Sequence, residues 1–192
     1  MEQSFRSRSL CLDDISHEVL KLLVDLGGYC TAQQASFLLN VGSAQPVRAR
    51  LRGLQRLGFL RRVSKYPAVY QVTKATTRLL GRDSSTRRRH TLETVQSRLL
   101  GVHFYLEVRP WPTSFVFDHQ EKIAVCEYIE CPLSLLPQRD GKPYLRENLL
   151  FWLPGWRVAI AMVDRAGPGE FVRLRVFLRQ FLEDVSAVVE GW

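Results

Sequence analysis

The sequence lacks the features of a membrane protein and of a disulfide-rich scaffold. Its longest uninterrupted apolar run, residues 158–163, is far too short to cross a bilayer, and we expect no signal peptide at the N-terminus. None of the four cysteines has Cys-x-x-Cys spacing, so reduced, buried thiols are expected. With 192 residues and 46% hydrophobic content, the chain can bury a core in one or two domains. We therefore expect a cytoplasmic protein without a membrane segment.

Motifs for common reaction chemistries are also missing. There is no G-x-x-x-x-G-K-[ST] loop for a nucleotide phosphate, no G-x-S-x-G and no H-E-x-x-H. The four histidines offer no metal-binding pair separated by one apolar residue. Cys126 and Cys131, if they share a strand, would lie on opposite faces and could not ligate one metal. We expect no enzyme activity, no cofactor and no metal site.

Acidic residues are missing from one stretch, and this absence points to a partner. Residues 45–63 contain six Arg and no Asp or Glu. Residues 1–90 carry 16 Lys and Arg against 6 Asp and Glu, whereas residues 91–192 carry 11 against 13. Of the 27 cations 22 are Arg, which suits phosphates and guanine edges, although a GC-rich coding bias would give the same preference. The regional charge predicts an anionic partner for the first half only.

A helix predicted over residues 43–57 is the centre of this basic region. Its apolar side on a helical wheel consists of Ala44, Val47, Leu51, Leu54 and Leu57. Its polar side consists of Gln45, Arg48, Arg52, Gln55 and Arg56. Ser43 is expected to cap the helix, and Pro46 is tolerated in its first turn. One side is expected to pack on a core and the other to face a partner.

Two helices are expected before the basic one. Asp14 or Ser16 is expected to cap the first, which continues to about residue 26 and ends at two glycines. Thr31 and Gln34 have the spacing of a capping box, which predicts a second helix that continues to about residue 39. Three short helices with a Gly-bearing turn before a basic third are typical of the helix-turn-helix order.

A hairpin is expected directly after the basic helix. Gly58 ends the helix, and strands are predicted at residues 59–63 and 68–72. The turn between them, Ser-Lys-Tyr-Pro, places Lys65 at its tip. A hairpin in this position is a wing, and its cations could lie along a groove or backbone.

The second half is expected to form a separate α/β domain. A helix over residues 91–108 has apolar residues three and four apart, which could form a dimer seam; packing on the second domain is the preferred interpretation. Strand-like runs at residues 114–118, 123–131, 145–153 and 157–163 precede a helix at 171–189. The expected fold class is α+β, with an N-terminal winged helix-turn-helix followed by a mixed sheet covered by helices. The expected segments are a flexible arm (1–12), the winged helix-turn-helix (13–82), a basic linker (83–90) and the C-terminal domain (91–192).

The basic helix and hairpin resemble bacterial winged helix-turn-helix proteins. The resemblance is carried by Leu51, Leu54, Arg56, Leu57, Gly58, Phe59 and Leu60, then by Tyr70, Val72, Thr73, Leu79 and Leu80. It covers about residues 13–82 and is strongest to the plasmid replication-relaxation and mobilisation-accessory group. The resemblance implies a DNA-binding protein of a mobile element, with relaxase or replication proteins as further partners.

In that group the C-terminal half resembles a nuclease-like sheet with a Glu-x-Asp-Arg-Gly pattern at a strand end. Asp164 and Arg165 match this pattern here, but Met162 stands where the Glu would be. A metal-dependent nuclease needs clustered carboxylates to hold Mg²⁺, so the departure weighs against catalysis. A nuclease is therefore the second alternative, after a winged-helix module that binds protein.

The leading hypothesis is a sequence-specific double-stranded DNA-binding accessory or regulatory protein. The expected DNA-contacting residues are Ser43, Gln45, Arg48, Arg50, Arg52, Arg56, Arg61, Arg62 and Lys65. Gln45, Arg48 and Arg52 are expected nearest base edges, because they occupy the exposed first turns. The other cations, including Arg50 at the apolar margin, are expected to contact phosphates. A homodimer is left open, to be decided by the symmetry of the DNA site.

Overall fold

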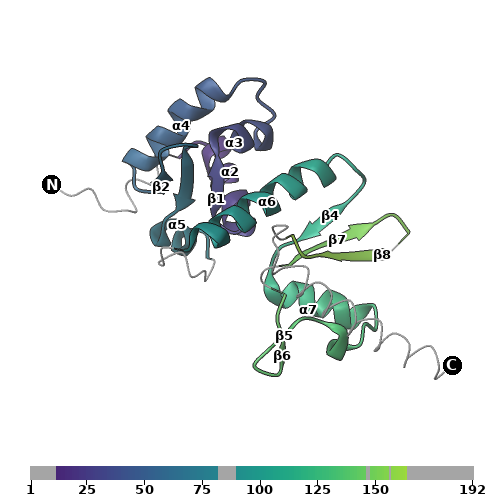
Figure 1. Cartoon of the computed structure of the whole chain (residues 1–192). Coiled ribbons are helices and arrows are strands. Elements are labelled where there is room, and N and C mark those ends of the chain that lie inside the picture. The colour runs from purple at the N-terminus through teal and green to yellow at the C-terminus, as the bar shows by residue number, and fades with distance from the viewer. Residues whose placement is uncertain (1–11, 82–89, 146–147, 156, 164–192) are drawn as a thin grey trace. The chain divides into compact units, whose positions relative to one another are not determined.

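The computed structural model describes residues 12–81, 90–145, 148–155 and 157–163, which form α-helices and small antiparallel sheets (Figure 1). The chain divides into two compact units, Met1–Trp111 and Pro112–Trp192. The arm before residue 12, residue 82, residues 83–89 of the basic linker, Asp164, Arg165 and the expected last helix lie outside the described residues. Within the part of the chain that is described, no helix combines the length and apolar character needed to cross a membrane.

The first unit opens with α2 (Asp14–Asp25), whose cap differs from the expectation. Asp13 is the N-cap, and its carboxylate accepts a hydrogen bond from the Ser16 backbone N–H at 2.9 Å. The sequence placed the cap at Asp14 or Ser16 because each of these residue types caps helices well. Gly27 and Gly28 follow the helix with φ values of 93° and 86°, which allow the chain to reverse at its end as expected.

The helix α3 (Ala32–Leu38) begins with the expected capping box. The Thr31 hydroxyl accepts from the Gln34 backbone N–H at 3.1 Å, and the Gln34 side-chain oxygen accepts from the Thr31 N–H at 3.0 Å. After a turn, α4 (Ala44–Arg56) follows. The turn contains Asn40, whose φ of 54° lies in the left-handed region that Asn tolerates.

A three-stranded antiparallel sheet supports these helices. It contains β1 (Tyr29–Thr31), β2 (Leu60–Ser64) and β3 (Val69–Val72), in the order β1-β3-β2. The hairpin β2–β3 confirms the sequence prediction, and α5 (Lys74–Leu79) follows it. The strand β1 was missing from the sequence interpretation, because three residues between two glycines and a capping box are too few to show a strand period.

The helix α6 (Leu92–Val108) belongs to the first unit, contrary to the expectation that it packs on the second domain. The Gln34 side-chain amide donates to the Leu99 carbonyl at 2.7 Å, and Arg98 Nη1 donates to the Gly27 carbonyl at 2.8 Å. At the end of α6, Arg109 donates to the Phe37 carbonyl at 2.8 Å. The first unit therefore extends through Trp111, beyond the boundary expected near residue 90.

The core of the first unit is formed by side chains of its helices and its sheet. Its fully buried side chains include Val19, Leu20, Leu23, Cys30, Leu51, Phe59, Leu60 and Val72. These residues come from α2, α4 and all three strands, so one apolar cluster fixes the position of α4 against the rest of the unit.

The second unit contains a small sheet that is wholly antiparallel, which corrects the expected mixed sheet. Its strands are β4 (Ser114–Val116), β7 (Leu149–Leu153) and β8 (Arg157–Ala161), in the order β4-β7-β8. A short ribbon of β5 (Gln138–Arg139) and β6 (Lys142–Pro143) surrounds the predicted Asp140-Gly141 turn, and a 3₁₀ helix (Leu133–Leu135) precedes it.

The strand expected at residues 123–131 is wrong, because most of it belongs to the helix α7 (His119–Tyr128). Asp118 caps this helix, because its carboxylate accepts a hydrogen bond from the Gln120 backbone N–H at 2.8 Å. In the sequence, the apolar run that follows Asp118 favoured a strand over a capped helix. Lys122 and Cys126, four residues apart, are buried on one side of the helix. Lys122 Nζ donates to the Asn148 carbonyl at 2.7 Å.

Candidate nucleic-acid interface

The helix α4 is held in the fold by one apolar side. Val47, Leu51 and Leu54 are buried beneath it, as the helical wheel predicts. Ser43 caps the helix, and its hydroxyl accepts from the Gln45 backbone N–H at 3.3 Å. The Ser43 hydroxyl therefore caps the first turn of α4 and fixes the residue at which the helix begins.

The opposite side of α4 presents a line of arginines to solvent. Arg48, Arg52 and Arg56 are exposed, and their four-residue spacing places them along about 12 Å of the helix axis. Arg52 Nε donates to the Arg48 carbonyl at 3.3 Å, which turns the Arg52 guanidinium toward the N-terminal end of the helix. Gln45 and Gln55 are also exposed beside this line. We call Arg48, Arg52 and Arg56 the arginine line.

The arginine line has no acidic neighbour in sequence. No Asp or Glu occurs from residue 26 to residue 82, a span that includes α3, α4, the hairpin and α5. The N-terminus of α4 adds the partial positive charge of its free amide groups. The combined charge favours an anion along this side of the helix.

Arg50, an expected phosphate contact, lies apart from the arginine line, and its guanidinium pairs within the protein. Arg50 Nη1 lies 2.6 Å from Asp13 Oδ1, 2.5 Å from Asp13 Oδ2 and 2.7 Å from Ser16 Oγ. The hydrogen bond from Arg50, with those from Ser16, lowers the pKa of the Asp13 carboxyl from 3.8 to about 2. Arg50 therefore ties α4 to the start of α2.

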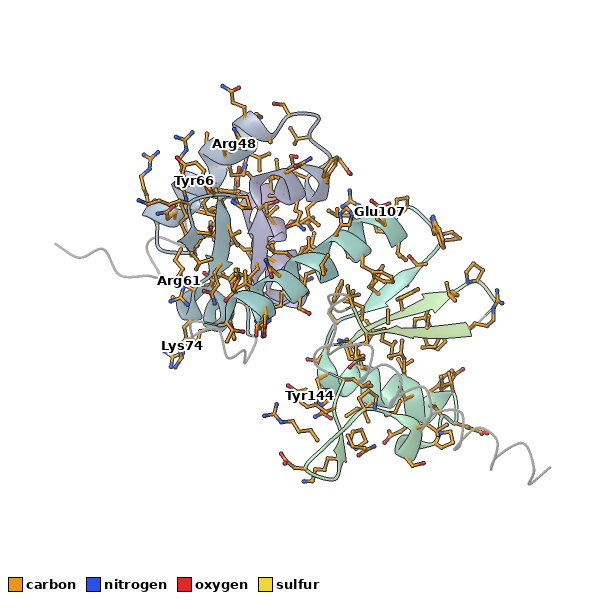
Figure 2. All side chains as sticks on the ribbon, viewed as in Figure 1. Arg48, Arg61, Tyr66, Lys74, Glu107 and Tyr144 are labelled. Atoms are coloured by element: carbon orange, nitrogen blue, oxygen red, sulfur yellow. The ribbon has the colours of Figure 1, made fainter. Side chains whose placement is uncertain are left out.

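Arg61 lies apart from the other expected DNA-contacting residues. Its side chain is on the face of the sheet that also carries Tyr29 and Gln71. Tyr29, Gln71 and Arg61 are direct partners across β1, β3 and β2, so their side chains share a face. Arg61 Nε donates to the Gln71 side-chain oxygen at 2.8 Å. On that face Arg98 of α6 lies over the Tyr29 ring, 5.7 Å from its centroid. Figure 2 shows Arg61 at the end of the hairpin where α5 begins, away from Arg48.

Arg62 organises the hairpin tip. Its Nε donates to the Ser64 carbonyl at 3.0 Å, and its Nη2 donates to the Lys65 carbonyl at 2.8 Å. The strand register shifts between Arg62 and Ser64, as in a β-bulge, which twists the strand near the tip. Lys65 is exposed at the tip as expected. Arg62 thus supports the turn, and Lys65 is its outermost cation.

Sequence reasoning missed one prominent residue of this surface. Tyr66, next to Lys65, is 92% exposed at the tip of the hairpin (Figure 2). The available signal was a large aromatic residue inside a four-residue turn, where small and polar residues are usual. Tyr66 therefore joins the arginine line and Lys65 as a candidate contact.

The metal-binding and thiol side chains of the described residues are of the types that catalytic sites use. The described residues contain no group of three or more His, Cys, Asp or Glu side chains that could hold a metal ion. Burial raises the pKa of the Cys30 thiol to about 12 and that of Cys126 to about 11, so both thiols stay protonated at neutral pH. No family model, curated protein or solved structure shows a significant match to this chain.

Proposed function

We propose that the first unit is a winged helix-turn-helix domain that binds double-stranded DNA. The order α3, turn, α4 and antiparallel hairpin supports this proposal, because it is the order of a helix-turn-helix followed by a wing. The observation that carries it is the arginine line, which is exposed on a helix whose other side is buried. The buried side of the helix, Val47, Leu51 and Leu54, holds that line in place.

The helix α4 has the dimensions and charge needed for the major groove. A helix with side chains is about 10–12 Å across, and the major groove of B-DNA is about 12 Å wide. Gln45, Arg48 and Arg52 occupy the first exposed turns of α4 and would reach base edges, where an Arg fork recognises guanine. Arg56, further along the helix, and Lys65 on the hairpin would neutralise phosphates.

The proposed process follows from the resemblance to plasmid replication-relaxation and mobilisation-accessory proteins. On that basis the protein is an accessory or regulatory factor of a mobile element, which would place its target at a replication, transfer or promoter site. Relaxase or replication proteins would be further partners. A homodimer is a further proposal: of the apolar seam of α6, Val102 is fully buried within the protein, whereas Leu92 is 72% exposed.

Selection of bound duplexes from a random pool tests DNA binding directly. A recurring motif is expected, and a palindromic motif would indicate a symmetric dimer. Binding of Arg48→Ala and Arg52→Ala is then measured on the selected duplex and on a scrambled one. Arg157→Ala, an exposed arginine of the second unit, is the matched control.

The two duplexes separate base reading from phosphate contact. Loss of a base contact weakens binding to the selected duplex by about 1–3 kcal/mol, with a smaller effect on the scrambled one. Loss of a phosphate contact weakens both duplexes equally. Equal losses for both variants would refute base reading by these residues. Failure of the wild type to bind any duplex would refute the proposal and favour the protein-binding alternative.

A further inference from the structure

The hairpin tip carries an aromatic ring that the fold does not bury. Tyr66 is 92% exposed, whereas the next most exposed large hydrophobic side chains among the described residues, Leu92 and Tyr128, are each 72% exposed. Exposing a ring of this size leaves a large apolar area in contact with water, which a binding partner can cover. We propose that Tyr66 is an aromatic wedge that enters the minor groove of the bound duplex and opens a base step there.

The tip is held in position before any partner arrives. Arg62 donates to the carbonyls of Ser64 and Lys65, so two carbonyls just before Tyr66 are fixed by one guanidinium. On the other side of the turn, Val69 and Tyr70 are buried at 3% and 4% exposure and anchor the returning strand. A ring on a fixed turn loses little conformational freedom on binding, which favours its use as a contact.

The positive charge near Tyr66 favours an anionic partner. Lys65 is exposed beside it, and the acid-free span from residue 26 to residue 82 contains the whole hairpin. A protein partner would be expected to meet the ring with apolar side chains, and the hairpin adds to Tyr66 one exposed large hydrophobic side chain, Val63 at 42%. A nucleic acid offers both phosphates for Lys65 and base faces for the ring.

The minor groove follows from the position of the tip relative to α4, and this step rests on the proposed function. With α4 in the major groove, a hairpin that follows it in the same unit extends across the sugar-phosphate backbone toward the neighbouring minor groove. Figure 2 shows Tyr66 on the same side of the first unit as Arg48, while Arg61 and Lys74 lie toward the other end of the hairpin. Aromatic and apolar side chains that enter the minor groove partly unstack a base step, most easily at flexible pyrimidine–purine steps.

Fluorescence of 2-aminopurine tests the wedge. The probe is a duplex about three helical turns long that contains the selected motif and a TA step on each side of it, with 2-aminopurine in place of one adenine. Unstacking raises its fluorescence, and anisotropy of an end label gives the affinity in the same titration. The full-length variants are Tyr66→Ala, Tyr66→Phe and the control Tyr128→Ala, which removes an exposed tyrosine of the second unit.

The wild type and Tyr66→Phe are expected to raise the fluorescence, because stacking requires the ring and not the hydroxyl. Tyr66→Ala is expected to lose the rise and to bind about 5- to 150-fold more weakly, while Tyr128→Ala behaves as the wild type. Because Tyr66 is exposed, its replacement is expected to leave the unfolding midpoint unchanged, which circular dichroism checks.

Three results would overturn the wedge. Unchanged affinity and fluorescence for Tyr66→Ala would show that the ring is not used. If the wild type binds without a rise in 2-aminopurine fluorescence and Tyr66→Ala binds more weakly, the ring contacts the DNA backbone and does not insert between bases. In both cases, weaker DNA binding by Arg48→Ala would still support the proposed function. A wild type that binds no duplex would overturn the proposed function together with the wedge.

Discussion

The ion pair between Asp13 and Arg50 can be tested separately from the helix cap formed by the same carboxylate. Asp13→Asn keeps a side-chain oxygen for the Ser16 backbone N–H, because Asn and Asp cap helices about equally. It removes the charge that faces the Arg50 guanidinium. Asp13→Ala removes both the cap and the charge. The difference between wild type and Asp13→Asn therefore isolates the ion pair, and the difference between the two variants isolates the cap.

Solvent exposure sets the size of the expected effect. The side chain of Arg50 is 31% exposed and that of Asp13 is 53% exposed, so water screens their attraction. We expect Asp13→Asn to lower the free energy of unfolding by about 0.5–1 kcal/mol, the upper range for exposed pairs, because Arg50 Nη1 reaches both carboxylate oxygens. Loss of the cap adds about 1 kcal/mol in Asp13→Ala.

The pH dependence has a defined sign. The pKa of Asp13 is lowered from 3.8 to about 2 in the folded protein, so the folded state favours the ionised carboxylate. The resulting stabilisation is present above the unfolded pKa and is lost as the pH falls through the folded pKa. The stability difference between wild type and Asp13→Asn should therefore shrink between about pH 4 and pH 2 and be constant near neutrality.

Urea unfolding followed by circular dichroism at neutral and acidic pH measures this difference. Asp14→Asn, one residue along in the first turn of α2, is the matched control for removing a nearby negative charge. If Asp13→Asn and Asp14→Asn lower the free energy of unfolding equally, the ion pair contributes nothing specific. A difference that stays constant down to pH 2 would refute the assigned cause of the pKa shift.

Further predictions concern the DNA contact, the core and a buried thiol. Arg56→Ala should reduce the slope of log affinity against log salt by about 0.9 on any duplex, and an equal change for Arg157→Ala would contradict a phosphate contact. Leu51→Ala should lower the free energy of unfolding by about 2–5 kcal/mol in urea titrations, because this side chain is 0% exposed beneath α4. Cys30, whose pKa is raised to about 12 by burial, should resist iodoacetamide at pH 8 until the protein unfolds. Peptide mass spectrometry checks this, and rapid native labelling would contradict the burial.

Local chemistry made much of the first unit predictable. The capping box of Thr31 and Gln34, the Ser43 cap and the two sides of α4 depend on residues a few positions apart, and the structure confirms all three. The hairpin was predictable for the same reason, since short β-rich runs flank its turn. These features are the ones that place the arginine line.

Long-range partners were not predictable from the sequence. The helical wheel put Arg50 at the apolar margin of the helix but could not identify its partner, because Asp13 lies 37 residues away in sequence. Arg61 and Arg62 looked alike, although strand alternation sends them to opposite faces of the sheet. The helix α7 was missed because its β-branched and apolar residues favour a strand locally, whereas its capping by Asp118 favours a helix.

The contact at the end of α6 has a mechanical consequence. Arg109 donates to the carbonyls of Phe37 and Leu38, and only Pro110 and Trp111 separate it from the first residue of the second unit. A force applied to the second unit would therefore be transmitted, through a few covalent bonds and the Arg109 hydrogen bonds, to the end of α3 and the turn that leads into α4.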